Sequence, residues 1–214
     1  MRNFLRLNGL SIVLIGFFLA TYLGGQALTG WHSHNDKRLE HNEAPLDLTR
    51  YLLSAHFLEA TAENWESEFL QMFVYVYMTA HLRQRGSAES KAPDEPPEEI
   101  CASPDSPWPV RKGGAWLKLY SHSLSLSLAL LFLISFWLHA CGSLRLENEE
   151  RARLGQTPHS MGEHLAGVQF WFESFQNWQS EFLAIATMVI LSIFLREKNS
   201  PESKLVAAPH HETG

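Results

Sequence analysis

Cysteine is scarce in this sequence, and its two copies stand in unlike surroundings. Cys101 lies in a polar segment and Cys141 ends an apolar run, so neither a zinc-binding spacing nor a disulfide framework can be built from them. Positive charge is also in short supply, because 17 lysines and arginines stand against 23 acidic residues, for a net charge of -6. A nucleic-acid partner needs a basic face, so this balance argues against one.

The sequence also lacks the motifs of the common enzyme classes. It has no nucleophile elbow, phosphate-binding loop, dinucleotide fingerprint or zinc signature. We therefore expect a protein that is not an enzyme, with no cofactor and no bound metal.

The apolar residues are gathered in four blocks, and the charged residues lie between them. Hydrophobic residues make up 45% of the chain and charged residues 19%, an average that would also suit a soluble domain. Residues 10–28, however, carry no charge over 19 positions. A helix needs roughly 20 apolar residues to span a bilayer, so the pattern predicts a membrane protein with very polar loops.

The first block also has features of a secretory signal peptide, because Arg2 and Arg6 precede it and residues 25–27 resemble a cleavage site. Against that, residues 116–119 (WLKL) match residues 4–7 (FLRL) and head a similar apolar run in mid-chain. No signal peptide can stand there, so we expect the first block to be a membrane span.

Two pairs of matching segments indicate a tandem duplication. Residues 64–70 (NWESEFL) return as residues 177–183 (NWQSEFL), with one difference. Residues 82–91 and 195–204 form a second pair, displaced along the chain by the same distance as the first. Two matches in register, without a gap between them, are typical of an internal repeat.

We expect an all-α membrane protein with four transmembrane helices from two parallel two-helix repeats, each with an outer interfacial amphipathic helix. The predicted boundaries are repeat 1 at 1–91 with spans at about 9–29 and 65–83, a Pro- and acid-rich cytoplasmic linker at 92–113, repeat 2 at 114–204 with spans at about 117–141 and 178–196, and a C-terminal tail at 205–214.

Between the spans, residues 31–46 are expected to form a polar loop and residues 47–63 an amphipathic helix in the membrane interface. Asp47 is placed to start that helix, and Asn64 to cap a new one. Ser160, with a glutamate three positions later, has the pattern of a capping box.

Two groups of residues have types suited to metal binding, and we assign a metal to neither. The first is a histidine group whose spacings of 2 and 7 suit a solvated loop better than a metal site: His32, His34 and His41. The second lies on one helical stripe and resembles the spacing of di-metal bundles: His56, Glu59, Glu63 and Glu66. The equivalent positions of the second repeat carry no carboxylate that could complete such a bundle site: Gln169, Phe172, Gln176 and Gln179.

Lysines and arginines are divided unequally between the two predicted sides of the membrane. Eleven of the 17 fall with the termini and the central linker, and six fall on the other side. The positive-inside rule then places both termini in the cytoplasm. We expect a multi-pass protein of the bacterial inner (plasma) membrane.

Several motifs resemble a family of uncharacterised bacterial integral membrane proteins. They are residues 9–11 (GLS), 25–31 (GQALTGW), 63–71 (ENWESEFLQ), 85–91 (RGSAESK) and 200–204 (SPESK). The resemblance covers most of the chain outside residues 92–112. It implies a small bacterial membrane protein and no particular chemistry.

Glu68 and Glu181 are the leading candidates for a functional site. A carboxylate within a span is costly, and a parallel repeat could bring the two together, flanked by Ser67 and Ser180, to hold a proton or a cation. The alternative is that both are solvated acids in the first turn of a helix, where the helix dipole favours them.

Two further groups have predicted structural roles. Trp65 and Trp178 are expected to anchor helix ends at the membrane interface. Gly16, Ala20 and Gly24 recur every fourth residue, a spacing that lets helices pack closely in lipid.

The leading expectation for function is a non-enzymatic scaffold or accessory protein of the cell envelope, because few polar groups are seen in mid-span. The alternative is a small proton- or cation-coupled transporter that uses Glu68 and Glu181. The expected partners are the lipid bilayer and either a second copy of the chain or another membrane protein.

Overall fold

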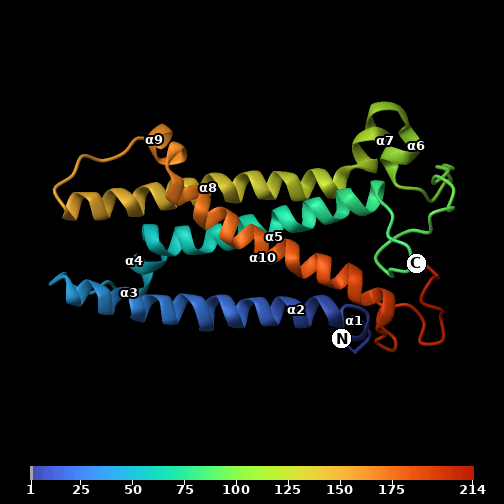
Figure 1. The fold of residues 1–214 in the computed structure, drawn as a ribbon, viewed down its shortest axis with the longest axis horizontal. Coiled ribbons are helices and arrows are strands. Elements are labelled where there is room, and N and C mark those ends of the chain that lie inside the picture. The colour runs from blue at the N-terminus through green and yellow to red at the C-terminus, as the bar shows by residue number, and fades with distance from the viewer. Residues whose placement is uncertain (1) are drawn as a thin grey trace. The chain divides into compact units, whose positions relative to one another are not determined.

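The computed structural model describes residues 2–214, in which all regular secondary structure is helical and no strand occurs (Figure 1). In chain order the elements are α1 (Arg2–Leu7), α2 (Gly9–Leu19), the π-helix η1 (Ala20–Ala27), α3 (Leu28–Glu40), α4 (Leu48–Leu52), α5 (Ala55–His81), α6 (Trp108–Lys112), α7 (Gly114–Ser121), α8 (Ser123–Arg153), α9 (Met161–Ala166) and α10 (Val168–Phe194). The all-helical prediction is confirmed for this part of the chain.

The chain divides into two compact units. The first comprises Met1–Ala62 and Leu138–His164, and the second comprises Glu63–Trp137 and Leu165–Gly214. Helices α5 and α8 each begin in one unit and end in the other. Each unit therefore draws on both halves of the sequence.

Within the described residues, three helical stretches are long and apolar enough to cross a membrane: Gly9–Glu40, Ser123–Arg153 and Val168–Phe194. We expected four, and the one that does not qualify is α5. That helix has 27 residues, but its first half carries four glutamates, which leave too short an apolar stretch behind them: Glu59, Glu63, Glu66 and Glu68.

The first long helix continues where a loop was expected. Elements α2, η1 and α3 follow one another in a single line (Figure 1), so residues 31–40 are helical. At 1.5 Å per residue, Gly9–Glu40 is about 48 Å long, against a hydrocarbon thickness of about 30 Å. A bilayer that holds α2 therefore leaves the polar α3 outside the hydrocarbon.

A residue with left-handed backbone follows the end of each of two helices. After α3, Asn42 has a φ of 58°, and after α8, Gly155 has a φ of 65°. This conformation is a common way to end a helix, and asparagine and glycine are the residues that adopt it most readily. Helix α8 consequently runs to Arg153, beyond the predicted span end near residue 141.

The expected interfacial helix at residues 47–63 is divided in two, and its second part is continuous with the next helix. After the short α4, helix α5 begins at Ala55 and passes through Asn64 without a break, so Asn64 does not cap a helix. The predicted start at Asp47 is confirmed, because its Oδ1 accepts a 3.0 Å hydrogen bond from the Arg50 amide. The Ser160 capping box is also confirmed, because the Ser160 amide donates to the Glu163 carboxyl at 2.8 Å.

The core of the first unit joins η1, α4 and the start of α5. Its centre consists of Ala27, Tyr51 and Phe57. The Tyr51 hydroxyl lies where a side chain on Gly30 would begin, so only glycine allows α3 and α4 to approach this closely. This contact fixes the turn between the first long helix and α5.

Elsewhere the long helices turn large apolar side chains outward. Leu10 is 75% exposed, Leu124 62% and Leu183 65%. Soluble proteins rarely expose continuous apolar surfaces of this size. The outward apolar faces are compatible with a membrane protein whose helices are surrounded by lipid.

Candidate functional site

A row of polar side chains follows helix α5 through the second unit. Its members recur every fourth residue and so lie on neighbouring turns of one side of the helix: Glu63, Ser67, Gln71, Tyr75 and Thr79. Ser67 and Gln71 are buried, and the others are half-buried. From Phe69 onward, the other faces of α5 are mainly apolar.

The end of this polar face that begins at Glu63 is bonded to α10. Asn177 Nδ2 donates to Glu63 Oε1 at 2.5 Å, and Gln71 Nε2 donates to the backbone oxygen of Glu181 at 2.9 Å. Between them Trp178 Nε1 donates to Glu66 Oε1 at 2.8 Å. Polar groups therefore hold these two helices together over two turns.

Glu66 is the most deeply buried acid of the described residues, with none of its surface exposed. Burial of a carboxyl group is costly unless hydrogen bonds replace the lost water. The Trp178 indole supplies one of them, and its ring packs edge-on against Phe132 and Phe175, with ring centroids 6.2 and 5.3 Å away. The aromatic contacts fix the direction of the N–H bond.

The predicted acids influence each other through charge, whereas the serines beside them bond within their own helices. Glu68 is exposed, Glu181 is half-buried, and the charge of Glu68 acts on the Glu181 carboxyl. Ser67 donates its hydroxyl to the Asn64 backbone oxygen at 2.9 Å. Ser180 is exposed and donates likewise to the backbone of its own helix at 2.8 Å. The proposed role of the acids as a proton or cation site remains a prediction.

The two predicted interface tryptophans have different surroundings. Trp65 is 36% exposed at the surface of α5, whereas Trp178 is half-buried and bonded to Glu66. A methyl group added at Gly16 or Gly24 would meet nothing within 4 Å, so the described chain places no partner against those positions. Their predicted helix-packing role, which includes Ala20, remains a prediction.

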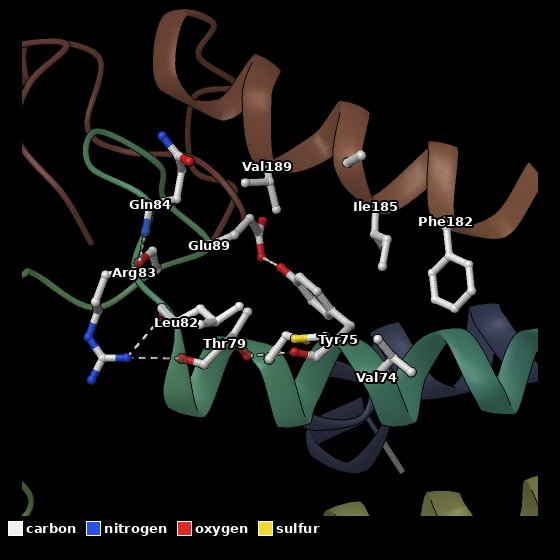
Figure 2. A pocket seen from close by; sticks show the side chains of 13 residues that line it. Val74, Tyr75, Thr79, Leu82, Arg83, Gln84, Glu89, Phe182, Ile185 and Val189 are labelled. Atoms are coloured by element: carbon white, nitrogen blue, oxygen red, sulfur yellow. Dashed lines mark hydrogen bonds between the residues drawn. The ribbon is translucent and has the colours of Figure 1, made fainter. Parts of the chain in front are cut away.

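A cavity of about 320 Å³ opens at the other end of the polar row, also within the second unit. Figure 2 shows Tyr75 on α5 and Glu89 from the following loop pointing toward each other beneath α10. The Tyr75 hydroxyl donates a hydrogen bond to Glu89 Oε2. Arg83 points away from this pair, and its Nη1 donates to backbone oxygens at the end of α5, including those of Thr79 and Leu82.

Glu89 has an unusual electrostatic environment. Burial raises the pKa of its carboxyl group, and the charge of Glu202 and a side-chain hydrogen bond with that residue raise it further, although the hydrogen bond from Tyr75 acts in the opposite direction. Its second oxygen, Oε1, is buried and has no hydrogen-bond donor among the described residues other than a protonated Glu202. Glu89 is therefore a carboxyl group to which a proton or a cation would bind favourably.

The loop that carries Glu89 is held by the C-terminal segment. Gly86 donates its amide to Thr213 Oγ1 at 2.8 Å, and the Gly214 amide donates to the Ser87 backbone oxygen. Lys204 is buried, and its Nζ donates to the backbone oxygens of Pro209, His210 and Glu212 at 3.3, 3.1 and 2.8 Å. The segment after residue 204 is thus an ordered part of the second unit.

Several hydrogen bonds recur between residues that the predicted duplication makes equivalent. In the first unit, Asn35 exchanges side-chain bonds with the backbone of Leu46, and Asn148 does so with His159. In the second, the Gln84 amide donates to Ser90 Oγ, and the Glu197 amide donates to Ser203 Oγ, both at 2.9 Å. Arg38 and Arg151 likewise each bond a backbone oxygen six residues ahead.

Residues that could hold a metal ion lie in the first unit. Glu59 on α5 and His139 on α8 offer ligand atoms within 4.8 Å of each other, and His139 is fully buried. A carboxylate with an imidazole suits divalent transition metals such as zinc or manganese. Sequence reasoning missed this pair because the two residues lie on different helices, and spacing along a single helix cannot reveal them.

A comparison with protein families identifies this chain. It belongs to the family described as Domain of unknown function (DUF6766), which matches residues 1–214. No curated protein and no solved structure matches the chain. Membership in a family without an assigned activity agrees with the resemblance found in the sequence.

Proposed function

We propose that this protein carries protons or small cations across a membrane along the polar face of α5. The observation that carries the proposal is the row from Glu63 to Thr79. At 1.5 Å per residue this row is about 24 Å long, close to the roughly 30 Å of a hydrocarbon core. A row of the same spacing on α8, from Ser135 to Arg151, leads instead into the charged end of its helix.

In this proposal α5 is the fourth membrane-crossing helix. Its polar face needs cover from lipid, and α10 supplies some of it through the bonds of Gln71 and Trp178. Polar residues within a membrane usually face the interior of a helix bundle and mark ion or proton pathways. In this proposal the polar residues that prevent α5 from qualifying as an apolar span form the pathway.

The residue types in the row suit the transfer of protons. Hydroxyl and amide side chains both donate and accept hydrogen bonds, so Ser67, Gln71, Tyr75 and Thr79 can form a relay. Glu63 and Glu66 lie at one end of the row, and Glu89 lies beside Tyr75 toward the other. In this proposal the exposed Glu68 and the nearby Glu181 collect protons or cations at the first end.

A scaffold role was favoured by the sequence because few polar groups were recognised in mid-span. The polar row on α5 supplies such groups, so their scarcity no longer argues against a transporter. The function proposed remains non-enzymatic. A scaffold would need only the outward apolar faces, and no specific observation in the described residues selects it.

The proposal retains the architecture expected from the sequence: two parallel repeats of two helices, in a bacterial inner membrane, with cytoplasmic termini. The hydrogen bonds that recur at equivalent positions support the duplication, because independent segments would not share side-chain-to-backbone bonds in register. The proposed environment is the lipid bilayer, in which Gly16, Ala20 and Gly24 leave a surface for a second copy or another membrane protein.

The test is proton and cation flux in proteoliposomes that contain a pH-sensitive dye. The wild-type protein is expected to acidify or alkalinise the lumen when a potassium gradient with valinomycin sets the membrane potential. Gln71→Leu and Tyr75→Phe are each expected to slow this flux at least tenfold. Tyr77→Phe is the matched control, because Tyr77 is on the same helix but 50% exposed.

Glu68→Gln and Glu181→Gln, examined in the same assay, test the predicted pair of acids. Wild-type vesicles that show no more flux of protons, sodium or potassium than protein-free vesicles would exclude this function and leave the scaffold. Equal rates for Tyr75→Phe, Gln71→Leu and wild type would exclude the polar row as the pathway.

A further inference from the structure

The cavity beside Tyr75 has apolar walls and a polar end. Its walls are apolar side chains of α5, of α10 and of the turn that follows α5: Val74, Met78, Leu82, Phe182, Ile185 and Val189. Its polar lining consists of Tyr75, Thr79, Arg83, Gln84, Glu89 and Ser90, with Tyr75 and Glu89 bonded to each other at its polar end. Its volume of about 320 Å³ lies at the lower limit for small-molecule sites.

The polar end carries acidic groups, and the basic residue at its border is directed elsewhere. One oxygen of Glu89 is bonded by Tyr75, while the other is buried and has no donor among the described residues other than a protonated Glu202. Glu202 lies close enough to act on Glu89, which adds a second acid. Arg83 borders the cavity, but its guanidinium is directed to the backbone at the end of α5 (Figure 2).

The chemistry of an occupant follows from the apolar walls and the polar end. A protonated amine would supply the donors that Glu89 Oε1 lacks and would reduce the repulsion from Glu202. A hydrocarbon chain attached to the amine would cover the apolar walls. A carboxylate or sulfate would instead place like charges together, and a neutral alcohol would leave the acids uncompensated.

We propose that this cavity binds a hydrophobic primary amine, with the ammonium group on Glu89 and the hydrocarbon chain between α5 and α10. This site goes beyond the proposed transport of protons or cations. It is occupied at equilibrium and needs no gradient. Its test therefore gives a result whether or not the polar row conducts.

The experiment measures binding of radiolabelled decylamine to the full-length protein in phosphatidylcholine nanodiscs, with protein-free nanodiscs as the blank. Saturable binding of one molecule per chain is expected, with affinity rising about fourfold for each methylene from octylamine to decylamine. Unlabelled decylamine is expected to compete, while decanol and decanoate, which enter the bilayer as readily, are expected to compete at least tenfold more weakly.

Two variants examine the two ends of the cavity separately. Glu89→Gln removes the charge and is expected to weaken binding at least tenfold, while Glu98→Gln, in the exposed linker, is the matched control and should not change it. Ala186→Phe places a ring in the cavity and should abolish saturable binding. A single symmetric peak in size-exclusion chromatography verifies that each variant is folded.

Three results would overturn the proposal: binding equal to that of the blank, decanol competing as well as decylamine, or full affinity in both Glu89→Gln and Ala186→Phe. If a variant is misfolded, the competition series on the wild type decides alone. Phosphatidylethanolamine added to the nanodiscs distinguishes the natural sources of the amine. A loss of decylamine binding identifies the lipid headgroup as the occupant, and unchanged binding identifies a free amine.

Discussion

The indole N–H of Trp178 donates a 2.8 Å hydrogen bond to Oε1 of Glu66, whose side chain is fully buried. The two residues belong to α10 and α5, which are far apart in the sequence. If the buried acid lost this donor, water could not replace it. The Trp178 side chain therefore stabilises the fold through its N–H group as well as through its aromatic packing. Trp65, the other residue of the predicted pair, is 36% exposed, and its role as an interface anchor remains a prediction.

Trp178→Phe is expected to destabilise the protein by about 1–3 kcal/mol, because it keeps most of the aromatic packing but removes a donor from the buried Glu66 carboxyl. Trp137→Phe, which alters a tryptophan of α8 that is 57% exposed, is expected to cost less than about 0.5 kcal/mol. Thermal unfolding of both variants in detergent measures the difference. Equal losses would show that the bond contributes nothing.

Gly142→Ala is expected to lower the melting temperature by several degrees. A methyl group there would lie 2.8 Å from the backbone nitrogen of Glu59, and a helix backbone cannot move aside as a flexible side chain can. Gly16→Ala is the control, because its methyl group would meet nothing within 4 Å and alanine favours a helix. An unchanged melting temperature for Gly142→Ala would mean that α5 and α8 are not so close there.

Glu89 is expected to make the stability of the protein fall as the pH rises. Its pKa is raised in the folded state by burial and by the charge of Glu202, and only the hydrogen bond from Tyr75 opposes this. The folded chain therefore binds more protons than the unfolded chain between the ordinary pKa of about 4.5 and the raised one. The contribution to stability is complete below that window and is lost as pH rises through the raised pKa.

The measurement is the melting temperature of wild type and Glu89→Gln from pH 4 to pH 8. The difference between the two melting temperatures should change with pH between the ordinary and the raised pKa of Glu89. Glu202→Gln should move this change to lower pH, because it removes a like charge beside Glu89. A constant difference at every pH would contradict the raised pKa.

Lys204→Ala is expected to release the segment that follows it. Lys204 holds three backbone oxygens, so its loss should speed amide hydrogen exchange in residues 205–214 at least tenfold, as expected for a loss of about 1.4 kcal/mol. Lys91→Ala is the matched control, because Lys91 is half exposed and forms its ion pair with Glu95 across 3.3 Å. Identical exchange in both variants would show that the tail is held by other contacts.

Cys101 provides a test of the predicted orientation. It is exposed in the linker, so a membrane-impermeant maleimide should label it only when the cytoplasmic face is accessible, as in inverted vesicles. The measurement is mass spectrometry of the labelled chain, with Cys101→Ser as the control for labelling elsewhere. Labelling of Cys101 in intact spheroplasts would reverse the proposed topology.

The sequence was most informative where local chemistry decides the structure. Asp47 and Ser160 start helices as predicted, because a capping side chain acts on amides within three residues of itself. The polar row of α5 could also have been found, since its spacing of four is visible in the sequence from Glu63 to Thr79. It was missed because Gln71, Tyr75 and Thr79 are uncharged and stand in a stretch that is otherwise apolar.

The features that escaped prediction depend on contacts between distant segments. Residues 31–40 are polar and were expected to form a loop, yet they are helical, and the Trp31 and Asn35 side chains bond the Leu46 backbone oxygen at 2.7 and 2.9 Å. The pairing of Tyr75 with Glu89 depends on how the loop after α5 folds back. No periodicity in the sequence carries that information.

The π-helix at Ala20–Ala27 changes how the small residues of the first span are arranged. A spacing of four slightly exceeds one turn of an α-helix, but it falls short of one turn of a π-helix, whose hydrogen bonds span five residues. The angular drift between Gly16 and Ala20 is therefore largely reversed between Ala20 and Gly24. The three positions form a straighter seam than a uniform helix would allow, so a neighbouring helix could lie along it without coiling around it.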